Sequence, residues 1–117
     1  MGIYTAYSYF RSVGNIIGQS PLWAEGVVNV HHGTYRIILG DHLSTEEKKV
    51  KTLLHELLHL SPENRGDLRI GLNRKYNPEL EDRIEKEVEE IYSCQPLLVA
   101  HLRKRVESLP FIDRFSL

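Results

Sequence analysis

The chain has 117 residues, of which 41% are hydrophobic and 26% are charged, and this composition predicts one compact soluble domain over residues 1–117. Fifteen Lys and Arg residues against sixteen Asp and Glu residues leave a formal charge of −1. That balance excludes a nucleic-acid binder that depends on bulk positive charge. No apolar run approaches the roughly 18 residues of a membrane-spanning helix, so we expect no membrane partner.

Cysteine usage and the first residues bear on the compartment. The one cysteine, Cys94, excludes an internal disulfide, and residues 1–7 lack the basic-then-apolar order of a signal peptide. Both observations favour a cytoplasmic protein. The unusual count is six histidines, because histidine is a common metal ligand and carries protons near neutral pH.

The first predicted elements are a helix and a hairpin. Apolar residues in the segment 3–17 recur at steps of three and four, which predicts an amphipathic helix. Two runs rich in β-branched residues, 27–30 and 34–39, flank a short turn that contains Gly33. This pattern predicts an antiparallel hairpin over about 27–39.

The second half of the chain is predicted to be helical. Ser44 and Glu47 form a Ser-x-x-Glu capping box, which predicts a helix over about 45–60 that Pro62 ends. After a loop, further helices are predicted over about 79–94 and 97–107. The expected fold class is α+β, in which a small antiparallel sheet packs on helix 45–60 and on helix 79–94, with further N- and C-terminal helices.

The predicted helix 45–60 contains the sequence His55-Glu56-Leu57-Leu58-His59. A step of four residues is about one helical turn, so both imidazoles leave the same face and can bind one metal ion. Glu56, one residue after the first histidine, is placed to act as a general base toward a water on the open side of that ion. The motif therefore predicts a metal site with His55 and His59 as ligands.

The apolar stripe of this helix tests whether the histidines belong to the core instead. His55 and His59 point roughly 150° away from the centre of the stripe, so they face either solvent or a cleft. The stripe comprises Val50, Leu53, Leu54, Leu57, Leu58 and Leu60.

A catalytic zinc site needs a third protein ligand, and the acidic helix 79–94 is the best source. On the helical wheel Glu87 falls roughly 55° from the centre of the apolar stripe, where a carboxylate is costly unless it is paired or bound to metal. Glu87 is therefore the expected third ligand. Glu81 lies about as near on the other side of the stripe but in the first turn, and it stays open as an alternative third ligand. Glu85 points well away from the stripe.

Two other features stay open as alternatives. Asp67 is a rival third ligand, because the segment 66–71 faintly resembles the aspzincin signature. The tail, residues 109–115, is largely apolar with one acid, and we hypothesise that it lies across the cleft with Asp113 in the place of the water.

The motif and the acidic helix behind it resemble the gluzincin pattern of zinc metallopeptidases. The segment 85–92 is also similar to the glutamate helix of the phage-repressor-cleaving peptidases, and the resemblance covers residues 27–96. It implies Zn²⁺ as cofactor, His55, His59 and Glu87 as its ligands, and Glu56 as general base and acid. It also implies that residues 34–39 form the rim of the cleft, where an extended peptide pairs with a strand edge.

We therefore expect a zinc-dependent metallopeptidase that hydrolyses peptide bonds in a peptide or protein substrate. The alternative is a non-catalytic metal-binding module, regulatory or interacting, that retains the motif without hydrolysis. A protein–protein module with an accidental motif is the third hypothesis.

Overall fold

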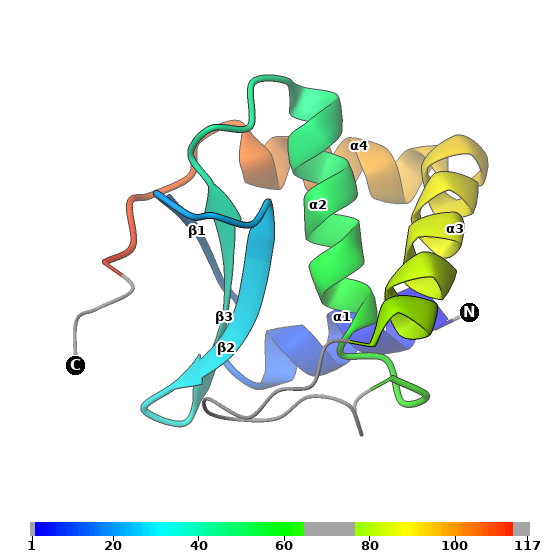
Figure 1. The fold of residues 1–117 in the computed structure, drawn as a ribbon, viewed down its shortest axis with the longest axis horizontal. Helices are drawn as coiled ribbons and strands as arrows, with labels where there is room; N and C mark the ends of the chain where they lie inside the picture. The colour runs from blue at the N-terminus through cyan, green and yellow to red at the C-terminus, as the bar shows by residue number, and fades with distance from the viewer. Residues whose placement is uncertain (1, 65–76, 114–117) are drawn as a thin grey trace.

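The computed structural model describes residues 2–64 and 77–113, and over these residues it is an α+β fold. In Figure 1 a three-stranded sheet lies on the left, and α2 stands between that sheet and α3. The elements in chain order are α1 (Gly2–Ser12), β1 (Ile16–Ser20), β2 (Gly26–His31), β3 (Thr34–Gly40), α2 (Glu46–Leu58), α3 (Pro78–Cys94) and α4 (Pro96–Val106).

The sheet is mixed, with the strand order β1-β3-β2. β2 and β3 form the predicted antiparallel hairpin, in which Val28 pairs with Ile37. β1 pairs with the other edge of β3 in parallel. The sheet is therefore mixed, whereas the sequence predicted an antiparallel one. This places β3 in the centre of the sheet and leaves β2 and β1 at its two edges.

The predicted helix over 3–17 ends early because two consecutive residues have positive φ angles. α1 ends at Ser12, and Gly14 (φ 139°) and Asn15 (φ 55°) then take positive φ values that an α-helix cannot contain. Ile16 and Ile17, which follow, pair with β3 as the first residues of β1. Their β-branched side chains favour this extended conformation.

α2 begins one residue later than the capping box predicted. The N-cap is Thr45, whose side-chain oxygen accepts a hydrogen bond of 3.1 Å from the backbone N–H of Lys48. At the other end, Asn64 donates a side-chain hydrogen bond of 2.8 Å to the carbonyl of Leu58. Both ends of the helix that carries the motif are thus held by polar side chains.

α2 is the central element of the core, since it packs against α1, α3, α4, β2 and β3. The predicted apolar stripe is confirmed, because all six of its residues are buried. They form one cluster with apolar side chains of the sheet and of the other three helices. None of the described helices is both long enough and apolar enough to cross a membrane.

Candidate metal centre

The two motif histidines lie one turn apart on α2, and their ring centroids are 5.1 Å apart. Nε2 of His55 lies 2.6 Å from Oε2 of Glu81, and Nε2 of His59 lies 3.2 Å from Oε1 of the same carboxylate. His59 is only 2% exposed, so its ring is enclosed rather than solvated. Both Nε2 atoms therefore converge on one carboxylate.

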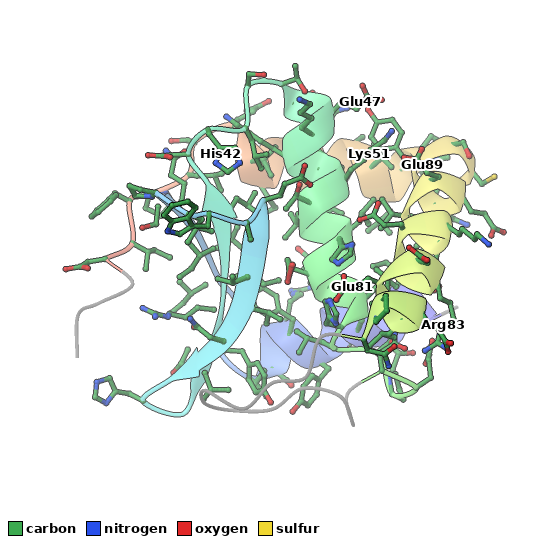
Figure 2. The ribbon with its side chains drawn as sticks, in the orientation of Figure 1. His42, Glu47, Lys51, Glu81, Arg83 and Glu89 are labelled. Carbon is green, nitrogen blue, oxygen red and sulfur yellow. The ribbon has the colours of Figure 1, made fainter. Side chains whose placement is uncertain are left out.

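Glu81 reaches the histidines from the first turns of α3. Figure 2 shows it between α2 and α3. The ligand atoms of His55, His59 and Glu81 all lie within 4.8 Å of one another. Two imidazole nitrogens and a carboxylate oxygen are a donor set that suits zinc, so these residues fit the ion that the motif predicts.

Glu85, one helical turn after Glu81, contacts the other ring nitrogen of His55. Its Oε1 lies 2.7 Å from Nδ1 of His55. This is an ion-pair distance without the alignment of a hydrogen bond. In metal sites, a carboxylate that binds Nδ1 of a histidine favours the tautomer with its proton there and leaves the lone pair of Nε2 for the metal. Sequence reasoning missed this contact, although the four-residue step from Glu81 to Glu85 repeats the step from His55 to His59.

Glu56 lies on the β2 side of α2 and is 6% exposed. A Cβ atom at Gly26, the first residue of β2, would lie 3.3 Å from Cγ of Glu56 and 2.7 Å from Cγ2 of Thr52. A side chain at position 26 would therefore press on the stem of Glu56 and on Thr52. Because Gly26 has no side chain, β2 lies directly against Glu56, which the motif predicts as the general base.

Glu87 does not join the three-residue group in the described part of the chain. It follows Glu81 by six residues, which is about 9 Å along α3 and about 120° around it. Partial burial raises the pKa of the Glu87 carboxyl, and the nearby charges of Glu63 and Glu90 raise it further. The carboxylate that the structure brings to the histidines is Glu81, which the sequence left as an alternative.

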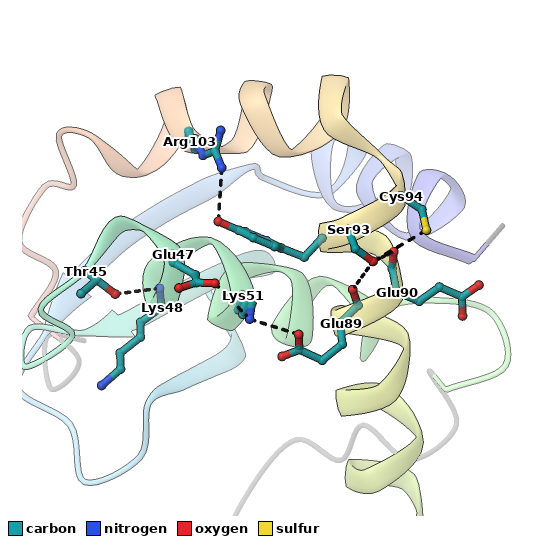
Figure 3. Close-up of polar contacts among 10 residues, drawn as sticks. Thr45, Glu47, Lys48, Lys51, Glu89, Glu90, Ser93, Cys94 and Arg103 are labelled. Carbon is teal, nitrogen blue, oxygen red and sulfur yellow. Dashed lines mark hydrogen bonds and ion pairs between the residues drawn. The ribbon is translucent and has the colours of Figure 1, made fainter.

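A polar cluster shown in Figure 3 links α2, α3 and α4 on the outside of their shared apolar core. Lys51 of α2 donates a hydrogen bond of 3.1 Å to Glu89 of α3, and this bond raises the pKa of the lysine. Its ammonium also lies 4.9 Å from the centre of the Tyr92 ring. Arg103 of α4 donates to the Tyr92 hydroxyl at 3.2 Å and forms an ion pair with Glu46.

Two further sequence predictions concern Asp67 and the C-terminal tail. Asp67 lies outside the described residues. In the tail, Gln19 of β1 donates its backbone N–H to the carbonyl of Pro110 and accepts from the N–H of Ile112. Residues 110–112 therefore pair with the β1 edge of the sheet, on the far side of β3 from β2, and the hypothesis that the tail crosses the cleft is not supported.

The predicted rim of the cleft is also different. Residues 34–39 belong to β3, whose two edges are both paired within the sheet, so that strand has no edge to offer a peptide. β2 is the edge strand on the side of Glu56.

Comparison with known proteins adds no family. No protein-family model, no curated protein and no solved structure is significantly similar to the chain. The functional argument therefore depends on the geometry of the site itself.

Proposed function

We propose that this chain is a zinc-dependent metallopeptidase of the gluzincin type, with His55, His59 and Glu81 as ligands of Zn²⁺ and Glu56 as general base and acid. The observation that carries the proposal is the convergence of the two Nε2 atoms on the Glu81 carboxylate. Helical spacing alone explains why the histidines are neighbours, but it does not explain why an acidic side chain from a second helix reaches both.

Each residue has a defined part in this chemistry. Zinc, when bound, acts as a Lewis acid on a peptide carbonyl and lowers the pKa of a water toward ~7. Glu56 takes the proton of the attacking water and transfers it to the leaving amine. Glu85 orients the ring of His55 through Nδ1, as carboxylates commonly do beside metal-bound histidines.

An extended peptide also needs a place beside Glu56, and the edge of β2 supplies one. Among the described residues no strand pairs with the outer edge of β2, so its backbone groups can accept an added strand. Gly26 at the start of that strand lies against Glu56. A peptide paired along β2 would therefore have its backbone close to the proposed base.

Metal analysis beside a Glu56→Gln variant tests the proposal. We expect one zinc per chain in both proteins, and peptide hydrolysis in the wild type that falls by at least about 100-fold in the variant, since general acid–base catalysis contributes about 10² to 10⁴. Hydrolysis of a mixed peptide library is read by mass spectrometry.

Two outcomes would contradict the proposal and separate its rivals. Zinc bound without hydrolysis in the wild type would favour the non-catalytic metal-binding module. Absence of stoichiometric metal would leave the motif as an accidental pattern. Glu63→Gln is a suitable control, because that exposed carboxylate lies after α2 and outside the three-residue group.

A further inference from the structure

A shallow hollow of about 510 Å³ lies at the end of the sheet where β2 begins. Its lining residues are Pro21, Leu22, Trp23, Asp41 and His42. Trp23 is the chain's one tryptophan and is 99% exposed, which is the highest exposure among the large apolar side chains of the described residues. An indole face left open to solvent in this way is a common feature of recognition sites.

Backbone hydrogen bonds hold the two segments that form the hollow. The N–H of Asp41 donates to the carbonyl of Ser20 at 3.0 Å, and the N–H of Gly40 donates to the carbonyl of Glu25 at 2.7 Å. The segment 21–24 is thus tied at both ends to the end of β3. The ring of His42 packs on Gly40, where a Cβ atom would lie 2.4 Å from Cε1 of the imidazole.

The charge of the hollow selects among the ligands that an indole face can take. Asp41 supplies a carboxylate to the lining, and the lining contains no Lys or Arg. The flanking Glu25 adds a second exposed carboxylate. A cation that stacks on the Trp23 ring is also attracted by the Asp41 carboxylate of the same lining, an attraction that an apolar side chain lacks.

We propose that this hollow binds the cationic side chain of a basic residue in a peptide, arginine in preference to lysine. The planar guanidinium stacks on an indole face while its edge donates to a carboxylate, and an ammonium does the two less well. The position of the basic residue rests on the proposed function. Trp23 comes shortly before β2, which begins at Gly26 beside Glu56, so a peptide paired along β2 reaches the hollow where it runs past the start of that strand.

The single tryptophan provides a direct test in the full chain carrying Glu56→Gln, which prevents cleavage. Trp23 emission is titrated with a hexapeptide that contains one arginine and with the same peptide carrying citrulline, its uncharged isostere. We expect a saturable change with the arginine peptide at millimolar concentration and an affinity at least threefold weaker for the citrulline peptide.

Two matched variants assign the effect to the carboxylate that lines the hollow. Asp41→Asn should abolish the preference for arginine over citrulline, because its backbone N–H still bonds to Ser20 but the charge is gone. Glu25→Gln removes a neighbouring charge outside the lining and should keep the preference. Equal affinity for the two peptides, tighter binding of a leucine peptide, no change in emission, or equal effects of the two variants would each overturn the proposal.

Hydrolysis by the wild type separates this inference from the proposed function. Cleavage without any preference for a basic residue, together with unchanged Trp23 emission, would refute the cation site alone. Binding of the arginine peptide to a protein that hydrolyses nothing would leave the cation site standing and refute the peptidase.

Discussion

Helix α3 carries carboxylates on both flanks of its apolar stripe, and the two flanks have different surroundings. On one flank Glu81 and Glu85 contact the two ring nitrogens of His55. On the other, Glu87 is half-buried near Glu63 and meets no imidazole in the described chain. The difference teaches that burial at the edge of a stripe does not identify a ligand, because only one edge of α3 is turned toward α2.

The largest expected effect separates Glu81 from Glu87. Glu81→Ala removes the carboxylate that both histidines contact, so zinc affinity should fall by more than the roughly 100-fold that is typical of changes behind the ligands. Glu87→Ala should keep zinc affinity within about twofold of the wild type. Competition with a chromogenic chelator measures both. The reverse order of effects would restore Glu87 as the ligand and refute the assignment of Glu81.

A smaller loss of zinc affinity is expected at Glu85, which contacts the proposed ligand His55. Glu85→Gln keeps the shape of the side chain but removes the charge beside Nδ1 of His55, and zinc affinity should fall by about 10-fold. Glu90→Gln, an exposed carboxylate on the same helix, is the matched control and should have no effect. If the two variants bind zinc equally well, the contact between Glu85 and His55 has no orienting role.

The next prediction concerns the contacts that Tyr92 of α3 makes with α2 and α4, and their effect on stability. Tyr92→Leu retains an apolar side chain but removes the ring that Lys51 and Arg103 approach and the hydroxyl that accepts from Arg103. The melting temperature should fall by a few degrees, about 2–4 °C. Thermal unfolding followed by circular dichroism measures this. An unchanged melting temperature would show that apolar packing alone sets the position of α3.

The smallest effect is a pH-dependent one at Glu87. Its raised pKa means that the ionised form is disfavoured in the folded protein, so this group costs stability as the pH rises through its folded-state pKa. Glu87→Gln should therefore raise the melting temperature slightly at pH 7, by about 1–2 °C, and lose that advantage below the ordinary pKa of a glutamate. A variant that is less stable than the wild type at pH 7 would indicate a favourable partner for the carboxylate.

Much of the fold followed from local patterns. The hairpin, the capped helix and the two later helices were predicted within a few residues, since alternation, capping and proline positions are short-range signals. β1 was missed because Ile17 also fits the helical period of residues 3–17. The parallel pairing of β1 with β3 joins residues about 20 positions apart, and no local pattern encodes it.

The sequence by itself determined that His55 and His59 share one face of a helix, that this face is not the core face, and that Glu56 sits beside them. It also determined that Glu81 and Glu87 lie on opposite sides of the stripe of α3. Only the tertiary structure decided which side meets the histidines and that β2, not β3, is the strand at the edge. The physical reason is that helical periodicity fixes a residue's angle about the axis of its own helix. The crossing of two helices depends instead on how both surfaces pack, here with Lys51 of α2 against the Tyr92 ring of α3.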